Sequence, residues 1–278
     1  MTKQFKSEQL QDIKNNTEYH GCAFYLQEHH KYILVNVEFH NCSFRTHVTF
    51  KTLINCHFHN CNFSGEFIVH LSNNQLQKIP DWVFDNNLIT ILNAQKNKIE
   101  IISLKIQKLE NMHSLDLSEN KISRIPPEIE KLEILFELDI SYNFILDLPD
   151  SFENLQNLSK LYLSSNELGM IPFELFPLKN LSELDVSHNE IQDITEFGEL
   201  KQIKNIDLAN NEVRVFPKKI EELINLKKID LSRNRIKKLP TQIKYLKILS
   251  EFRLKSNEIN SKEQSKIKSL LPNCQFYF

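Results

Sequence analysis

The sequence is poor in glycine, with four glycines among 278 residues, and the motifs that depend on glycine are missing. It contains no GxxxxGK(S/T) phosphate loop, no GxSxG nucleophile motif and no HExxH zinc motif. A run of about 18 uncharged apolar residues, which a membrane-spanning helix needs, is also missing, as is a signal-peptide-like stretch at the start. These absences predict a protein without catalytic activity, cofactor or membrane span.

Cysteine is scarce too: the chain has five, an odd number, and it is long enough to bury a core without disulfide bonds. Free thiols are typical of a reducing compartment, so we expect a cytoplasmic location and, by default, a monomer. The alternative location is outside the cell, as a host-directed binding protein exported by a nonstandard route. The cysteines are Cys22, Cys42, Cys56, Cys61 and Cys274.

Asparagine recurs with a regular period over most of the chain. The spacing between the repeated asparagines is constant except at one place, between Asn189 and Asn211, where it is a single position shorter. Regular periods of this length are typical of solenoid proteins, in which each repeat contacts its neighbours. The repeated residues are Asn74, Asn97, Asn120, Asn143, Asn166, Asn189, Asn211, Asn234 and Asn257.

Apolar residues around each asparagine follow the frame LxxLxLxxNxL, and an apolar residue followed by proline usually comes five residues later. The LxL part has a period of two and predicts a short strand, whereas stretches such as "PPEIEKLEIL" have the spacing of a helical turn. Each repeat is therefore predicted to be a strand, a turn and a helical return. Stacked repeats would share one core and form a curved parallel sheet.

The repeats "MHSLDLSENKISRIPPEIEKL" at 112–132 and "LKKIDLSRNRIKKLPTQIKYL" at 226–246 resemble leucine-rich repeats of the 23-residue class with an IPxxI segment. This class is similar to intracellular Ras-group-related and bacterial leucine-rich repeat proteins. The resemblance spans residues 66–260, which we take as nine repeats. It implies an α/β horseshoe with strands on the concave side, and a role in binding proteins.

The repeated asparagine is interpreted as a structural residue. Turned inward at the end of a strand, its amide can satisfy backbone groups of adjacent coils that would otherwise be buried unpaired. Replacing one with alanine should cost about 1 to 3 kcal/mol. The single shorter interval lacks the proline and contains Gly198, and we expect one convex turn to be shortened there.

Residues 261–278 are predicted to cap the solenoid with a helix and a strand. Ser261 and Gln264 have the spacing of a capping box. Apolar residues follow on one helical face and then alternate after Pro272 as in a strand; they are Ile267, Leu270, Leu271, Cys274, Phe276 and Phe278. Terminal repeats need such covers.

Residues 1–65 are predicted to form an atypical N-terminal cap, in which "FHNCSF" at 39–44 returns as "FHNCNF" at 58–63. Apolar residues recur there at five-residue steps, which resembles the coils of pentapeptide-repeat proteins. A competing fit follows the leucine-rich frame, with cysteine in place of asparagine. Both fits bury Cys42 and Cys61, and the pentapeptide fit turns His40 and His59 outward, so the sequence leaves the two fits open.

Histidines are concentrated in this first part, with eight of the ten before residue 71. A metal-binding regulatory protein is therefore an alternative function, in which His57, His59 and Cys61 would meet Zn²⁺ with another coil, and the stacked His40 and His59 are the first suspects. Structural zinc sites favour paired ligands on tight turns, such as CxxC, and no such pair occurs. We therefore expect packing and solvated side chains there, with no metal.

The middle repeats carry the candidate binding residues. Exposed aromatic residues with a charged rim are the composition of interface hot spots. The aromatic and histidine side chains predicted to contact a partner are Tyr142, Phe144, Tyr162 and His188, and the acids around them are Glu137, Asp139, Glu183 and Asp185. An alternative is that Phe144 packs under the neighbouring coil.

Charge is divided along the chain. Residues 66–200 hold ten Lys or Arg and 23 Asp or Glu, whereas residues 201–278 hold eighteen and eight. The basic part includes Arg233 and Arg253, which we place near the inner surface. Such a field steers oppositely polarised partners, while an acidic middle would repel nucleic acid. The sequence therefore predicts a protein partner bound on the concave face.

Overall fold

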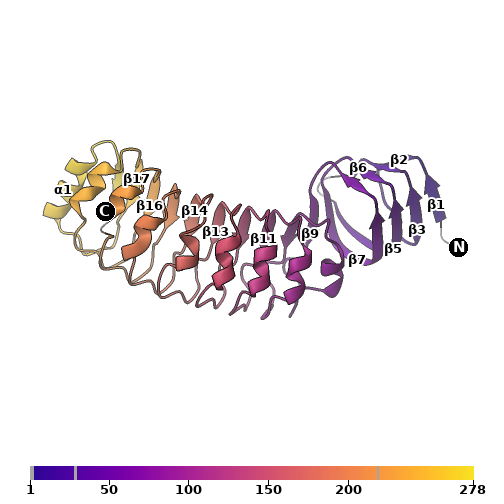
Figure 1. Ribbon diagram of the computed structural model, residues 1–278, viewed down its shortest axis with the longest axis horizontal. Coiled ribbons are helices and arrows are strands. Elements are labelled where there is room, and N and C mark those ends of the chain that lie inside the picture. Colours follow the sequence, from indigo (N-terminus) through magenta and orange to yellow (C-terminus); the bar gives the residue numbers. More distant parts are fainter. Residues whose placement is uncertain (1–2, 28–29, 218) are drawn as a thin grey trace.

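A parallel sheet of 14 strands runs through the whole molecule, in the order β1-β3-β5-β7-β9 and then β10 to β18 (Figure 1). The computed structural model describes residues 3–27, 30–217 and 219–278. Every pair of neighbouring strands is parallel, because each coil returns to the same edge before the next strand begins. The predicted α/β solenoid with a long parallel sheet is confirmed.

The first coils have two sheets. The long sheet here comprises β1 (Lys3–Lys6), β3 (Thr17–His20), β5 (Lys31–His40), β7 (Val48–His59) and β9 (Phe67–His70). A second sheet of four strands comprises β2 (Gln9–Leu10), β4 (Ala23–Phe24), β6 (Ser43–Phe44) and β8 (Asn62–Phe63). In the long sheet Thr17 pairs with Val37, and Val37 pairs with Cys56. These coils are shorter than those that follow, in which Leu115 pairs with Leu138.

Aromatic rings fill the interior of these coils. One ladder runs from Tyr19 to Phe39 and Phe58, with ring centroids 5.4 and 4.7 Å apart. A second ladder runs from Phe24 to Phe44, at 4.8 Å. Phe24 and Phe39 join the two ladders edge to face at 5.6 Å. Both ladders therefore run along the stack of coils and bind each coil to the next.

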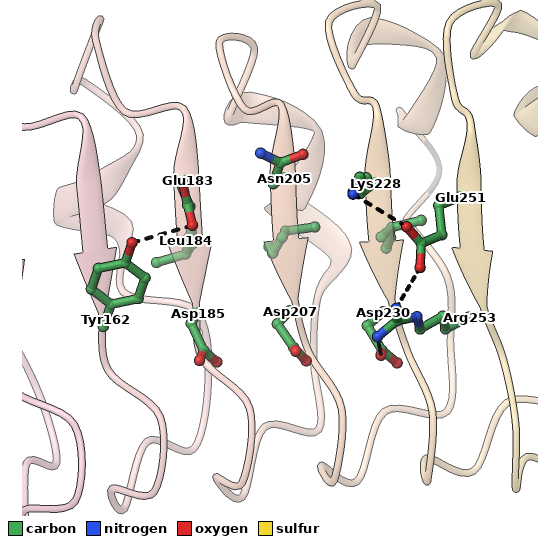
Figure 2. Close-up of a pocket in the computed structure, with 12 residues that line it drawn as sticks. Tyr162, Glu183, Leu184, Asp185, Asn205, Asp207, Lys228, Asp230, Glu251 and Arg253 are labelled. Carbon is green, nitrogen blue, oxygen red and sulfur yellow. Dashed lines mark hydrogen bonds and ion pairs between the residues drawn. The ribbon is translucent and has the colours of Figure 1, made fainter.

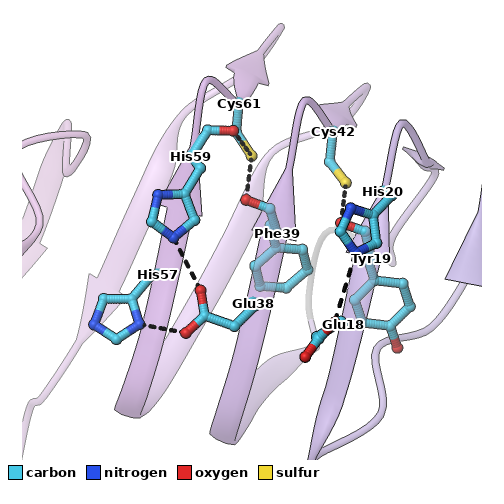
Figure 3. Close-up of polar contacts among 9 residues, drawn as sticks. All are labelled: Glu18, Tyr19, His20, Glu38, Phe39, Cys42, His57, His59 and Cys61. Carbon is cyan, nitrogen blue, oxygen red and sulfur yellow. Dashed lines mark hydrogen bonds and ion pairs between the residues drawn. The ribbon is translucent and has the colours of Figure 1, made fainter. Parts of the chain in front are cut away.

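Cys42 and Cys61 point inward, as both sequence fits predict. Cys42 is buried and Cys61 is half-buried against the core. The Cys42 thiol donates to the carbonyl oxygens of Tyr19, on the preceding coil, at 3.4 Å and of His40 at 3.5 Å. Figure 3 shows the matching contact of Cys61 with the carbonyl of Phe39. The thiols therefore pack in the core and link neighbouring coils.

Each later coil has a short strand whose central side chain is buried. The strands are β10 (Ile91–Asn93), β11 (Ser114–Asp116), β12 (Glu137–Asp139), β13 (Lys160–Tyr162), β14 (Glu183–Asp185), β15 (Asn205–Asp207), β16 (Lys228–Asp230) and β17 (Glu251–Arg253). This pattern is the period of two that the LxL segment predicts.

The predicted helical returns are short 3₁₀ helices. They are η1 (Asp81–Asp85), η2 (Leu104–Lys108), η3 (Pro127–Lys131), η4 (Asp150–Asn154), η5 (Phe173–Leu175), η6 (Thr195–Glu199), η7 (Ile220–Glu222) and η8 (Thr241–Tyr245). The proline before several of them has an extended conformation and starts the helix, as at Pro149. The short period of the repeats leaves room for only this one tight turn on the convex side.

The repeated asparagines form a continuous ladder of hydrogen bonds. Nδ2 of Asn143 donates to the carbonyls of Leu117 on the preceding coil, Ile140 and Ser141 at 3.0, 3.1 and 3.0 Å. Its Oδ1 accepts from the backbone N–H of Ile122 at 2.9 Å. The predicted structural role is confirmed from Asn97 to Asn257. Asn74 differs, because its amide donates to Leu71 within its own coil.

The coil with the shorter interval, between Asn189 and Asn211, packs tightly around Gly198. Gly198 lies in η6, and a Cβ added there would come within 2.7 Å of the carbonyl oxygen of Lys219. Glycine is therefore needed because the two coils approach so closely. The residue lost from this coil comes from its convex return, since β14 and β15 keep their register.

The C-terminal segment has a helix, α1 (Ser261–Leu270), and a last strand, β18 (Gln275–Tyr277), paired with β17. The predicted capping residue was wrong. Asn260, not Ser261, caps α1, and its side chain accepts from the N–H of Glu263 at 2.9 Å. In the described residues, no helix combines the length and apolar character needed to cross a membrane.

Candidate concave binding surface

The strands of the repeats turn their first and third side chains away from the core. Each strand has partly exposed ends and a buried centre, as in β12 and β14. Because the strands pair in exact register, equivalent side chains stand in rows across the sheet. Two rows therefore cross the concave face, one from the first position and one from the third.

A shallow depression of about 300 Å³ lies on this face over β13 to β17 (Figure 2). The central strand residues Leu184, Ile206 and Ile229 lie beneath it, with their side chains buried in the core. Polar and charged side chains surround the depression; they are Tyr162, Glu183, Asp185, Asn205, Asp207, Lys228, Asp230, Glu251 and Arg253. Such a lining is suited to hydrogen bonds and ion pairs with a partner.

Ion pairs occupy the basic end of the depression. Arg253 contacts Glu251 at 2.6 Å and Asp230 at 3.5 Å, and Lys228 contacts Glu251 at 3.4 Å. The Arg253 guanidinium also lies over the ring of Tyr277, 5.6 Å from its centroid. These contacts hold Arg253 in place on the sheet, with half of its side chain still exposed.

At the other end, the Tyr162 hydroxyl donates to Oε1 of Glu183 at 3.2 Å. Burial and the carboxylates of Glu183, Glu137 and Asp139 raise the pKa of Tyr162. The phenol therefore stays neutral and keeps its proton for hydrogen bonding. This end of the surface is acidic, in contrast to the paired charges around Arg253.

The third strand position carries a row of aspartates. Oδ1 of Asp139, Asp185 and Asp207 accepts from the backbone N–H two residues later, at 2.9, 2.9 and 2.8 Å. Burial raises the pKa of Asp207 to about 6, with further contributions from Asp185 and Asp230. Burial likewise raises the pKa of Asp139. Each aspartate therefore helps to form its own turn, and the row concentrates negative charge.

The predicted contact residues form two groups, one on the strands and one in the turns that follow the strands. Glu137 and Asp139 on β12, Tyr162 on β13, and Glu183 and Asp185 on β14 stand on three adjacent strands. Four others lie in the turns after the strands, and Arg253 is on β17; the turn residues are Tyr142, Phe144, His188 and Arg233. The structure thus spreads the predicted aromatic residues between the sheet and the adjoining loops.

Phe144 is exposed. Half of its surface, 50%, is accessible, and that of Tyr142 is 58% accessible. The alternative in which Phe144 packs under the neighbouring coil is therefore wrong. Its position directly after the ladder asparagine points it out of the coil, while the next residue, Ile145, is buried.

Sequence reasoning missed the residues at the basic end of the depression. Asn205, Lys228 and Glu251 start their strands and line the depression. The alternation in LxxLxLxxN already places this position on the outer face. They were missed because the first strand position was considered only beside the aromatic residues, at Glu137 and Glu183, and not along the later strands.

The thiols of the first coils differ in their pKa. Burial raises the pKa of Cys22 and of Cys56, which keeps both thiols protonated. A hydrogen bond with Cys61 lowers the pKa of Cys42 to about 6, but Cys42 is buried in the core, whereas reactive cysteines are partly exposed. In the described residues, the group of side chains placed to hold a metal ion consists of Glu38, His40 and His59 on the first coils.

Comparisons with known proteins agree with this architecture. A family model described as a leucine-rich repeat region matches residues 87–215. A second model, described as a leucine-rich repeat, matches residues 225–246. No curated protein sequence matches the chain.

Solved structures of bacterial proteins share the fold. A leucine-rich repeat protein of Leptospira interrogans is 23% identical and has a TM-score of 0.65; the match covers 95% of this chain and 78% of that one. The internalin InlF of Listeria monocytogenes is 16% identical, with a TM-score of 0.68 and coverage of 98% and 84%. The internalin InlC2 of the same species is 24% identical, with a TM-score of 0.60 and coverage of 71% and 84%.

The family models cover the regular coils in which the structure has short strands, 3₁₀ returns and the asparagine ladder. The solved structures extend the likeness of fold to the first coils, because two of them cover at least 95% of the chain. The chain therefore belongs to the leucine-rich repeat proteins.

Proposed function

We propose that the protein is a non-catalytic scaffold that binds a protein partner on the concave face of its repeats. The observation that carries this proposal is the surface around β12 to β14. Tyr162 stands there between two acidic strands and lines the depression. Tyr142 and Phe144 lie in the adjoining turn, and 58% and 50% of their surfaces are exposed. Such aromatic residues are typical anchors of protein interfaces.

The turn at Tyr142 supports a role in binding. Tyr142 has a φ of 53°, in the left-handed region that side chains other than glycine and asparagine rarely adopt. The equivalent position of other coils is occupied by polar residues, such as Glu119 and Ser165. The left-handed conformation is therefore a property of the repeated turn. What distinguishes Tyr142 is a large exposed ring at this position, which is suited to contact with a partner.

The charge distribution suggests which partner would fit. The coils from residue 66 to residue 200 are strongly acidic, and those after it are basic. The aspartate row adds to the acidic side, while Arg233 and Arg253 lie on the basic side. A partner with a basic patch opposite β12 to β14 and acidic groups opposite β17 would be steered into place.

Lack of catalysis is part of the proposal. Leucine-rich repeat folds usually present surfaces and not reaction centres, and the thiols of the first coils are buried or half-buried. The depression is shallow, and its ionised groups either pair with one another or stabilise their own turns. This arrangement is suited to recognition.

The test is affinity capture from an extract of the producing organism, read by quantitative mass spectrometry. Wild type is compared with a variant that carries Tyr142→Ala, Phe144→Ala and Tyr162→Ala. The matched control carries Phe173→Ala, Ile224→Ala and Tyr245→Ala, three exposed residues on the return side of the coils. We expect partners to be lost with the concave variant and kept with the control.

If partners remained bound to the concave variant and were lost with the control, the result would place the binding surface on the convex side. A purified partner then allows a second measurement. If charge steers the encounter, the association rate should fall as salt is raised, whereas the dissociation rate should change little.

The cytoplasm is the proposed location, on the basis of the free thiols in the described coils. Cell fractionation tests it. Recovery of the chain from the culture medium would favour the secreted, host-directed alternative. The capture experiment would then use an extract of host cells as the source of partners.

A further inference from the structure

Histidines and glutamates form a regular array on the outer surface of the first coils. Strand register aligns Glu18 with Glu38 and His20 with His40 between β3 and β5. It aligns Glu38 with His57 and His40 with His59 between β5 and β7. Residues two apart on a strand share a face. The three strands β3, β5 and β7 therefore each present two of these side chains on the outer face. The second of the two is a histidine on every strand: His20, His40 and His59.

Three of these side chains converge. The ligand atoms of Glu38, His40 and His59 all lie within 4.8 Å of one another. Nε2 of His59 is 2.9 Å from Oε2 of Glu38 (Figure 3). A tetrahedral zinc site with bonds of about 2.1 Å separates its ligand atoms by about 3.4 Å. Small rotations of exposed side chains are enough to close the difference.

Neighbouring side chains hold the carboxylate in position. Nδ1 of His57 lies 2.8 Å from Oε1 of Glu38, the oxygen that does not face His59. A hydrogen bond to the outer oxygen of a carboxylate ligand is a common way to orient it. Glu38 is thus fixed between two histidines, with one oxygen turned towards each.

The strands beneath are rigid. His20, His40 and His59 stack with ring centroids 4.7 and 4.6 Å apart. On the inner face, Phe39 stacks on Phe58 at 4.7 Å, directly between the outward pairs of β5 and β7. Stacking on both faces keeps the strands in register, while the exposed side chains remain free to turn towards an ion.

We propose that Glu38, His40 and His59 bind a divalent transition-metal ion, Zn²⁺ first, with water as the fourth ligand. Two imidazoles and one carboxylate are suited to zinc and its neighbours in the first transition row, and not to Mg²⁺ or Ca²⁺. The ion takes the place of the polar contact between Glu38 and His59. It ties β5 to β7, two successive coils of the N-terminal stack.

The test is zinc titration of the purified full chain after removal of metal with a chelator. Wild type is compared with His59→Ala and Glu38→Gln, and with His188→Ala, which removes a histidine from the repeats. We expect one zinc ion per chain in wild type and at least a tenfold loss of affinity in the first two variants. His188→Ala should bind zinc as wild type does.

Two further readouts separate a true site from general histidine affinity. Zinc should raise the midpoint of thermal unfolding in wild type and His188→Ala, but not in His59→Ala or Glu38→Gln. Cobalt should give visible absorption bands without a thiolate charge-transfer band, since no cysteine is a ligand. An equal loss of affinity in all three variants, a thiolate band or the absence of zinc binding at micromolar concentration would overturn the proposal.

The variants should keep the fold, so that the measurements report on the site alone. The side chains of His59 and Glu38 are 52% and 34% exposed, so neither replacement opens the core. Glu38→Gln also preserves the shape of the side chain and its ability to hydrogen-bond the histidines. Equal unfolding midpoints of the metal-free proteins would show that only the site has changed.

Discussion

The first coils and the later repeats link successive turns of one sheet with different side chains. In the repeats, each asparagine makes about four hydrogen bonds, which at Asn143 are 2.9 to 3.1 Å long. In the first coils, Cys42 makes two longer contacts of 3.4 and 3.5 Å to carbonyl oxygens. A thiol is a weak donor and cannot replace an amide as an acceptor. The first ladder is therefore weaker than the second.

The turn that positions both ladders is nevertheless the same. The residue before Cys42, Asn41, has a φ of 54°, and the residue before Asn143, Tyr142, has a φ of 53°. Both ladder side chains also donate to a carbonyl of the preceding coil. In these respects the first coils follow the leucine-rich frame, with cysteine in place of asparagine. The resemblance to pentapeptide-repeat coils stays a prediction.

The cores differ in the opposite sense: the first coils, which have the weaker ladder, have the larger stacked side chains. The first coils stack large rings along the solenoid, whereas the repeats are filled mainly by leucine and isoleucine. Aromatic side chains bury more area and gain from ring contacts. The comparison teaches that a solenoid can be held together either by a polar ladder or by a stacked core.

The largest expected effect comes from the aromatic ladder. Phe39→Ala should lower the free energy of unfolding by about 4 kcal/mol, because it opens a cavity and breaks two ring stacks. The matched change in the repeats, Leu138→Ala, should cost about 3 kcal/mol. Urea unfolding followed by circular dichroism measures both. Equal costs, or a larger cost at Leu138, would contradict the difference between the two cores.

Next comes the asparagine ladder. Asn143→Ala should cost about 2 kcal/mol, since it removes four hydrogen bonds and leaves the buried N–H of Ile122 without a partner, while the carbonyls of Leu117 and Ile140 each keep another asparagine donor. Hydrogen exchange should increase in its own coil and in the preceding one, around Ile140 and Leu117. A cost below about 1 kcal/mol would mean that water replaces the amide and that the ladder is not a major source of stability.

The cysteine ladder should matter less. Cys42→Ala removes a small buried side chain and two weak contacts, so we expect a cost of about 1 kcal/mol. Cys42→Ser, of nearly the same shape, is the control because it keeps a donor in the same place. If Cys42→Ala proved as costly as Asn143→Ala, the two ladders would have to be regarded as equally strong.

The smallest effect concerns the outer faces, where the first coils pair histidine with glutamate and the repeats align aspartates. The pKa of Asp207 is about 6 in the folded chain, above the value of about 3.9 expected when unfolded. Its contribution to stability is therefore present below about pH 4 and is lost as the pH rises through 6. Asp207→Asn should remove this loss, so the free energy of unfolding of the variant should improve relative to wild type between pH 4.5 and 7. Parallel pH curves would contradict the assignment.

Much of the fold was predictable from the sequence because its period is regular. The asparagines marked every strand end, and the alternation around Leu115 or Leu161 identified the buried side. The cap of α1 was misplaced by one residue, since Asn260 and Ser261 are both good caps and only the backbone distinguishes them.

The candidate sites were less predictable because they depend on neighbours far apart in sequence. The ion pair between Arg253 and Asp230 joins two strands, β17 and β16, that are separated in sequence by a whole repeat. The convergence of Glu38 with His59 depends on the register of β5 and β7 in an irregular part of the chain. Sequence reasoning named His40 and His59 on neighbouring coils as the first suspects for a metal site. It expected solvated side chains there because no paired ligands of the CxxC kind occur, and it missed Glu38, which only the strand register brings to His59.

The ladder of shared asparagines also has a consequence for the order of unfolding. Each ladder amide contacts its own coil and the one before it, so a coil in the repeats cannot detach without breaking bonds on both sides. A stack coupled in this way loses structure from its ends. Because the thiol ladder is weak, the stacked rings must hold the first coils together. Pulling on both ends of a Phe39→Ala variant should therefore unwind the N-terminal coils first and leave the proposed binding surface intact.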